Sequence, residues 1–181
     1  MAVTAPERIE TERLLLRRNI AGDAQAIFRE YAQDAEVTRY LPWMPHKSVA
    51  ETQAFMQRCR EVWDAGDAFP FAIVRKEDGV LMGMIEIRVN GHCADIGYVL
   101  ARPYWGNGYV TEAAKAAVHW AASQPGIHRV WAYCDVENRA SQWVLEKAGM
   151  EQEGLIRRWA VSPNVGEMPR DCFFYSLPGN G

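Results

Sequence analysis

The sequence has little of what marks several large classes of protein. Its four cysteines, Cys59, Cys93, Cys134 and Cys172, are widely spaced and form no C-x-x-C pair. We therefore expect reduced packing residues and no metal, because disulfide frameworks and metal sites usually need tighter patterns. No apolar run approaches the ~20 residues of a membrane span, and the N-terminus lacks a signal peptide's apolar stretch and cleavage site. A soluble, cytoplasmic protein with no membrane partner is expected.

The chain also lacks a surplus of positive charge. It has 20 Lys and Arg against 23 Asp and Glu, so a broad electrostatic interaction with nucleic acid is not expected. Its 181 residues suit one domain that can bury a core without crosslinks. No repeat, low-complexity segment or linker divides it. We expect a single domain over residues 1–181, with roughly the first ten and the last few residues loose.

What is present is an alternation of strand and helix patterns. Asp23 is placed to cap a first helix, and Ser48 with Glu51 forms a capping box for a second helix that ends near Gly66. Asn90–Gly91 predicts a hairpin turn. Two further helices are expected over 110–121 and 138–148, and strands over 13–18, 69–75, 80–89, 93–100, 129–136 and 171–177. This order predicts an α/β (α+β) domain with a mixed, mostly antiparallel sheet.

Two glycines, Gly106 and Gly108, stand one residue apart between the strand 93–100 and the helix that begins near Val110. Glycines let the chain turn sharply with N–H groups facing outward, and the helix start adds unpaired donors and a positive dipole end. A diphosphate suits this geometry. The alternative, a turn that uses glycines for sterics alone, is the more frequent for a lone G-x-G. No P-loop motif is present, and the third Rossmann glycine would fall at Thr111.

The glycine loop belongs to one of three segments that are informative when they are taken together. They are "IGYVL", "YWGNGYVTEA" and the pattern N-x-x-S-x-x-x-x-E-K-x-G, which runs from Asn138 to Gly149. In this order and spacing the chain closely resembles the GNAT superfamily of acyl-CoA-dependent N-acetyltransferases. Within that superfamily it is similar to the RimJ/RimL-like branch, which is associated with ribosomal-protein N-termini. The resemblance extends from "TERLLLRR" to "CFFYSL", nearly the whole chain.

The resemblance implies acetyl-CoA (or CoA) as co-substrate, and a twisted sheet with helices on both faces and a splayed, V-shaped slot. In such folds a bulge in the strand "IGYVL" opens the slot, where the pantetheine arm lies along the backbone. An N–H near Val99 would then face the thioester oxygen. Val110 departs from the family pattern, which has a small residue there. The residues expected to bind CoA are Tyr98, Val99, Leu100, Trp105, Gly106, Asn107, Gly108, Tyr109, Val110, Thr111, Asn138, Ser141 and Lys147.

Three of these residues lie on one expected helix and have structural alternatives. Asn138 would hydrogen-bond the pantetheine, yet Asn is also among the best N-caps, and both roles would use one amide group. Ser141 could donate a hydrogen bond to the departing thiolate, or could satisfy its own helix end. Lys147 would meet the phosphates of CoA, or could be merely solvated.

The reaction needs a neutral amine. An α-amino group has a pKa of ~7.8 and a lysine of ~10.4, so an α-amine needs little help beyond a weak base. Glu86 and Asp95, on strands that should flank the slot, are candidates, although each also fits a solvent-facing strand position. No cysteine in the CoA motifs lies close to a histidine, so a covalent acetyl-enzyme is not predicted.

The acceptor is less defined. Tyr40 and Trp43 lie in a proline-punctuated loop, and Trp159 follows a basic pair. These aromatic residues could form the acceptor pocket or could close the core. The acceptor could be a protein N-terminus, including a ribosomal one, or a small amine such as a polyamine, an amino acid or an antibiotic. A CoA-binding sensor without turnover is the second class of function. A monomer and a homodimer both remain open.

Overall fold

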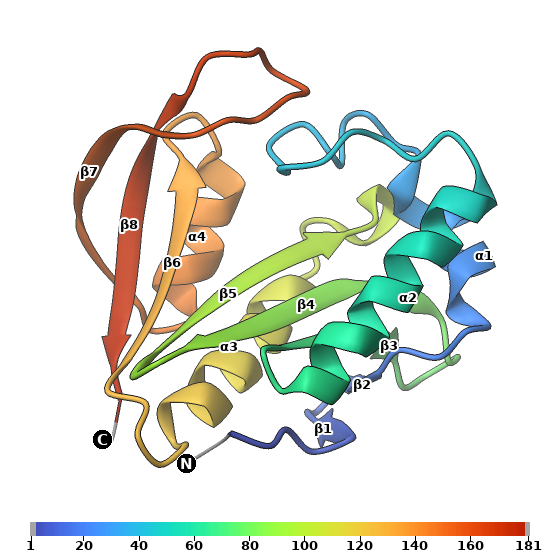
Figure 1. The fold of residues 1–181 in the computed structure, drawn as a ribbon, viewed down its shortest axis with the longest axis horizontal. Coiled ribbons are helices and arrows are strands. Elements are labelled where there is room, and N and C mark those ends of the chain that lie inside the picture. The colour runs from blue at the N-terminus through green and yellow to red at the C-terminus, as the bar shows by residue number, and fades with distance from the viewer. Residues whose placement is uncertain (1–2, 180–181) are drawn as a thin grey trace.

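The computed structural model describes residues 3–179 and consists of one twisted eight-stranded sheet with helices on both faces (Figure 1). The strand order is β1-β2-β3-β4-β5-β6-β8-β7. The elements are β1 (Arg8–Glu10), β2 (Leu14–Arg18), α1 (Asp23–Ile27), the π-helical turn η1 (Phe28–Ala32), α2 (Val49–Ala65), β3 (Ala68–Arg75), β4 (Leu81–Asn90), β5 (Cys93–Leu100), the 3-10 turn η2 (Arg102–Tyr104), α3 (Tyr109–Ala122), β6 (Arg129–Asp135), α4 (Arg139–Lys147), β7 (Glu151–Ala160) and β8 (Arg170–Pro178).

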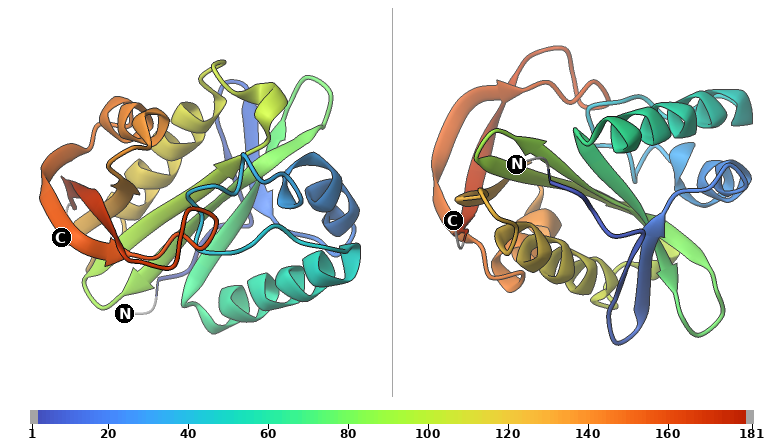
Figure 2. Two further views of the ribbon diagram at one scale, coloured as in Figure 1. Left: turned by 90° about the horizontal axis from the view of Figure 1, so that it is seen from above. Right: turned by 60° about the horizontal axis from the view of Figure 1, so that its bottom comes forward.

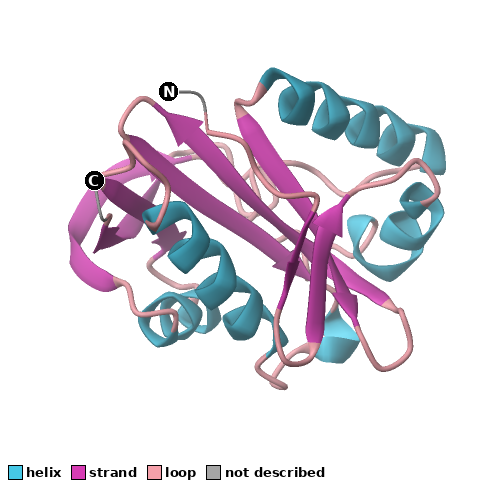
Figure 3. Cartoon of the chain, turned by 90° about the horizontal axis from the view of Figure 1, so that it is seen from below, coloured by secondary structure: helices cyan, strands magenta, loops and turns pink. Residues whose placement is uncertain are grey.

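The helices divide between the two faces of the sheet (Figures 2 and 3). On one face α2 packs on β3, and α1 packs on β4; on the other, α3 packs on β5 and β4, and α4 on β6 and β8. The helix expected over 110–121 is present as α3, and its apolar side chains at helical spacing, from Ala113 to Ala121, form a buried stripe. On the opposite face Ile27 and Tyr31 pack with Met84 in a second cluster. The expected mixed sheet, covered on both faces, is confirmed.

The sheet splits between β5 and β6, which form the single parallel pair among the described strands. These strands pair only over Cys93–Asp95 and Arg129–Trp131, and then diverge, so the second half of β5 has no neighbour on that edge (Figure 1). The slot is present, but the bulge expected in β5 is not. The β4–β5 register is unbroken from Gly83–Leu100 to Asn90–Cys93. The slot therefore opens because β6 turns away, with no residue inserted into β5.

Two helix starts differ from the sequence pattern in instructive ways. Ser48 accepts a hydrogen bond from the N–H of Glu51, as expected, but the Glu51 carboxylate accepts from the N–H of Lys47 at 2.9 Å and not from that of Ser48. The prediction that Asp23 caps α1 is wrong. Its carboxylate pairs with Arg17 at 2.7 Å and accepts from the N–H of Ile20 at 3.0 Å, so it fastens the preceding turn to β2.

Both edge strands were missed by the sequence patterns. Arg8–Glu10 pairs with Leu15–Arg17, so the N-terminal segment expected to be loose is ordered there; residues 1–2 and 180–181 lie outside the described residues. Within residues 3–179 all four cysteines are free, and Cys59, Cys134 and Cys172 are buried. No described helix is long and apolar enough to cross a membrane, and no group of metal-ligating side chains is found in the same range.

Candidate active site

One cavity of about 1280 Å³ lies where β5 and β6 separate. It exceeds the ~300–1,000 Å³ usual for a pocket that holds one small ligand, so it has room for two reactants. Its walls come from both faces of the sheet: α1 and the loop after it, β4, β5, the start of α3, β6 and α4. All the predicted site residues line it except Asn107 and Trp159.

The glycine loop forms one end of the cavity. Gly106 and Gly108 both have a φ of 76°, in the left-handed region that favours glycine, and Gly108 is the N-cap of α3. Among the described residues, none accepts a hydrogen bond from the backbone N–H groups of 106–111. The predicted helix start is present, with its donors free for an anion. Val110 packs partly against the core, so its bulk is not all presented to the loop.

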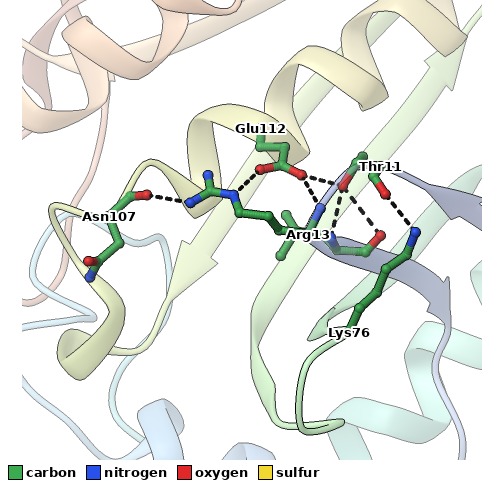
Figure 4. A network of polar contacts seen from close by, with 6 residues as sticks. Thr11, Arg13, Lys76, Asn107 and Glu112 are labelled. Carbon is green, nitrogen blue, oxygen red and sulfur yellow. Dashed lines mark hydrogen bonds and ion pairs between the residues drawn. The ribbon is translucent and has the colours of Figure 1, made fainter.

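A polar network outside the cavity holds this loop in place (Figure 4). No pattern in the sequence indicated it. Arg13 donates to the Asn107 carbonyl at 3.0 Å and pairs with Glu112 at 2.7 Å. Glu112 also accepts from the Thr11 hydroxyl at 2.6 Å and from the N–H of Arg13 at 2.8 Å. Burial raises the pKa of Glu112, but these hydrogen bonds and the Arg13 charge outweigh it and lower that pKa. Asn107 therefore braces the loop from outside the cavity.

The free edge of β5 forms the middle of the cavity. The Leu100 carbonyl accepts a hydrogen bond from the Trp105 indole at 2.7 Å, so this tryptophan folds back onto the strand. The Val99 carbonyl is turned toward β4, where a β-carbon on Gly83 would lie 2.1 Å from its oxygen. Gly83 is thus required for the close approach of β4 and β5 beside the slot.

Three polar side chains lie close together across the slot: Asn138 and Ser141 at the start of α4, and Tyr98 on β5. The Asn138 carbonyl oxygen caps the helix by accepting from the N–H of Ser141 at 3.2 Å. Its amide nitrogen donates no hydrogen bond to any residue of 3–179. The two roles considered for Asn138 therefore use different atoms and do not compete.

The hydroxyls of Ser141 and Tyr98 are hydrogen-bonded at 2.6 Å, and Tyr98 also reaches the Ser141 carbonyl at 3.3 Å. Burial raises the pKa of Tyr98, and the bond to Ser141 only partly offsets this. Tyr98 was predicted through its backbone alone, so its side-chain role was missed. Tyr98 and Ser141 lie 43 positions apart in the chain, and no local pattern joins them.

Comparisons with known proteins agree with this geometry. The model of the acetyltransferase (GNAT) domain matches residues 13–151. The chain is 31% identical over 155 residues to the uncharacterised N-acetyltransferase p20 of Bacillus licheniformis, covering 83% of this chain and 86% of that one. It is 27% identical over 163 residues to the [ribosomal protein uS5]-alanine N-acetyltransferase of Escherichia coli, covering 85% and 83%. A structure of Mycobacterium smegmatis RimJ with a CoA-disulfide has a TM-score of 0.81 at 25% identity, covering 91% and 81%.

The chain belongs to the GNAT acetyltransferase family. It is an acetyl-CoA-dependent N-acetyltransferase with a single GNAT domain. RimJ/RimL ribosomal-protein acetyltransferases are among its relatives and structural neighbours, as the sequence resemblance indicated. The position of each candidate residue can now be compared with the part expected of it in this family.

The two candidate bases of this GNAT domain share one partner. Glu86 pairs with Arg88 at 2.6 Å, and Asp95 pairs with the same guanidinium. Gly97 makes room for this arrangement, because a β-carbon there would lie 3.3 Å from the guanidinium. Both carboxylates line the cavity. Their lone pairs are partly engaged, which weakens the case for either as the base.

On the acceptor side the predicted aromatic residues separate. Tyr40 and Trp43 line the cavity, and Trp43 packs beside His46 and Phe55. Trp159 does not line the cavity, because it lies on β7, beyond β8, and packs edge-on against Tyr133 and Phe174. It therefore does not share the cavity wall with Tyr40 and Trp43, and a part for Trp159 in acceptor binding stays a prediction. Lys147, in the last turn of α4, is exposed at the cavity wall.

A second missed feature joins the two loops that border the acceptor side. Asn164, in the β7–β8 connection, donates to the carbonyls of Thr38 and Trp43 at 2.7 and 2.8 Å. One amide group thus fastens two loops more than 120 positions apart in the chain. The acceptor wall is therefore held in a defined shape.

Proposed function

We propose that this enzyme transfers the acetyl group of acetyl-CoA to the α-amine of a peptide or protein N-terminus, by direct attack while both reactants are bound. One observation carries the proposal. A single cavity of about 1280 Å³ joins the glycine loop, the free edge of β5 and the Ser141–Tyr98 pair to an acceptor side that Tyr40 and Trp43 line. Two reactants in one cavity need no covalent intermediate on the protein.

The residues present fit CoA. The free N–H groups of 106–111 would hold its diphosphate, helped by the positive end of the α3 dipole. The amide nitrogen of Asn138 would donate to a carbonyl of the pantetheine arm, and Lys147 would approach a phosphate. The arm itself would lie along the free edge of β5, over Tyr98, Val99 and Leu100. An N–H near Val99 would stabilise the oxyanion that develops on the thioester oxygen.

The Ser141–Tyr98 pair accounts for the leaving group. As the amine nitrogen forms its bond to the carbonyl carbon, the carbon–sulfur bond breaks and negative charge develops on sulfur. We assign the Ser141 hydroxyl as the donor to that sulfur, with the Tyr98 hydroxyl replacing its proton across their 2.6 Å contact. Because burial raises the pKa of Tyr98, the phenol is protonated at neutral pH and can donate. The proton that the attacking nitrogen loses goes to water, and a proton from water restores the Tyr98 hydroxyl, so the products are the amide and the CoA thiol.

The acceptor's own ionisation supports the choice of an α-amine. Glu86 and Asp95 are held by Arg88, so the strongest base candidates are partly neutralised. An α-amine with a pKa of ~7.8 is partly neutral at pH 7.5, whereas a lysine at ~10.4 is almost wholly protonated. Because both carboxylates are paired with Arg88, Glu86 and Asp95 would act at most as weak bases through a water molecule.

A thiol-release assay with acetyl-CoA tests the proposal. The acceptor panel would hold short peptides with a free α-amine, the same peptides with a blocked N-terminus and a free lysine, and a polyamine. We expect turnover with the first group well above the other two. Preference for the polyamine would make this a small-molecule acetyltransferase. CoA binding by calorimetry without turnover on any amine would support the sensor function instead.

A further inference from the structure

Four aromatic side chains of β6, β7 and β8 form a cluster beside the acceptor side of the cavity. We call it the aromatic shelf: Trp131, Tyr133, Phe174 and Trp159. The ring of Phe174 is nearly parallel to those of Trp131 and Tyr133, with centroids 5.4 and 5.8 Å away. Trp159 meets Phe174 edge-on at 5.0 Å. Trp131 and Tyr133 also line the cavity, so the shelf continues its wall.

The shelf is open on its outer side. Trp131, Tyr133 and Phe174 are only half-buried, and Trp159 is 48% exposed. Opposite Phe174 in the β7–β8 ladder stands Gly154, and a β-carbon there would have no atom within 4 Å. The residue directly opposite therefore supplies no side chain to cover the ring, and the contact from β7 is the edge-on one of Trp159. Aromatic surface of this size is usually buried in a core or used for binding.

An acidic ion cluster lies at the β5 end of the shelf. Glu86 and Asp95 share the single guanidinium of Arg88. Asp95 is the β5 partner of Trp131 in the parallel register, so this cluster stands next to the first ring. Two carboxylates and one guanidinium leave one excess negative charge there.

The other end of the shelf has the same arrangement. Asp135 follows Tyr133 by two positions on β6 and so lies on the same face of the sheet. Asp135 and Glu137 share the guanidinium of Arg170, which lies 2.8 Å from Glu137. One excess negative charge remains at this end too. Both ends of the shelf therefore favour a cation between them.

Within residues 3–179 no cationic side chain covers a ring of the shelf. Elsewhere in residues 3–179 an arginine guanidinium lies within 6 Å of an aromatic ring centroid at Tyr109, Trp63, Tyr40, Phe55 and Tyr104. None lies over a shelf ring in that part of the chain. A cation held between two acidic clusters and against aromatic surface gains from both.

We propose that the aromatic shelf binds a positively charged side chain of the acceptor. The enzyme would then prefer N-terminal segments that carry arginine or lysine a few residues after the reacting amine. This rests on the proposed function and adds its substrate class, a basic peptide N-terminus. Trp131 and Tyr133 become specificity-determining residues, because they belong to both the cavity wall and the shelf, and an extended peptide would pass from one to the other.

Two peptides of equal shape that differ only in the charge at two positions test this. Both start with alanine and have the same sequence, one with arginine at the third and fourth positions and the other with citrulline, which keeps the shape and removes the charge. We expect kcat/KM about tenfold higher for the arginine peptide. That ratio should fall toward one in Trp131→Leu and Tyr133→Leu, and should persist in Ile20→Ala, which changes an exposed apolar residue outside the cavity.

A binding measurement separates this inference from the proposed function. Each peptide is titrated by calorimetry into the CoA-loaded wild-type protein, so the result does not depend on turnover or on how the variants fold. Tighter binding of the arginine peptide without acetylation would keep the shelf and overturn the proposed function. Acetylation of both peptides with equal kcat/KM and equal affinity would keep the function and overturn the shelf.

Discussion

At the scale of single residues, the proposed chemistry depends on residues in which two polar groups have different roles. Asn138 caps α4 with its carbonyl oxygen and leaves its amide nitrogen unclaimed among residues 3–179. The N–H of Ser141 donates to that cap, and its hydroxyl is hydrogen-bonded to the hydroxyl of Tyr98. A single helix start thus provides a pantetheine donor and a thiolate donor, while the cap keeps both in fixed positions.

Replacing Asn138 with aspartate separates the role of its carbonyl oxygen from that of its amide nitrogen. Asn138→Asp keeps the capping oxygen and removes the amide donor, so we expect thermal stability close to wild type but CoA affinity about five- to tenfold weaker. Asn138→Ala is the matched control, because it should lose stability as well. Thermal unfolding and calorimetry measure the two effects. Wild-type CoA affinity in the aspartate variant would reduce Asn138 to a helix cap.

The Ser141–Tyr98 pair makes a prediction about non-additivity. Ser141→Ala should lower kcat by ~10²-fold with little change in CoA binding, because thioester sulfur accepts hydrogen bonds poorly before the bond breaks. Tyr98→Phe should also lower kcat, since it removes the group that replaces the serine proton. If Tyr98 acts only through Ser141, the double variant loses no more than Ser141→Ala alone. Multiplied losses in the double variant would mean that each residue contacts the substrate by itself.

At the scale of elements, the glycine loop is positioned by a strand far from it in the sequence. Arg13, immediately before β2, reaches Asn107 of the loop and Glu112 of α3 (Figure 4). It also lies over the Tyr109 ring, 4.6 Å from the centroid. The unpaired N–H groups that suit a diphosphate are therefore held in place by contacts outside the cavity.

Removing the charge of Glu112 should loosen this loop. We expect Glu112→Gln to weaken CoA binding several-fold at neutral pH by calorimetry, whereas Glu77→Gln, at an exposed carboxylate in the β3–β4 turn, should leave it unchanged. Because the pKa of Glu112 is lowered in the folded protein, its contribution to stability is present above its ordinary value of 4.5 and is lost as the pH falls below it. Urea unfolding should therefore separate wild type from Glu112→Gln at pH 7 and bring them together near pH 3. A constant difference across that range would contradict the assignment.

At the scale of the whole molecule, what the sequence predicted depends on how local the signal was. The hairpin at Asn90–Gly91, the glycine loop and the buried stripe of α3 are local patterns, and all are present. The strand β7 was missed because it is exposed along almost its whole length and shows no alternation of apolar and polar residues. The Arg13–Glu112 and Tyr98–Ser141 contacts join distant segments, so only the fold brings them together.

The arrangement of the whole cavity leads to a last prediction, which concerns pH. Glu86 and Asp95 are both paired with Arg88, which weakens the case for either as a general base, and burial raises the pKa of the Tyr98 phenol, which therefore stays protonated. The rate should then follow the acceptor's own ionisation. With an alanine-start peptide, kcat/KM should rise about tenfold per pH unit below ~7.8 and level off above it. A peptide whose α-amine has a lower pKa should shift the break by the same amount. A break that stays at one pH for both peptides would instead reveal a titrating base on the enzyme, and the search for it would begin at Glu86 and Asp95.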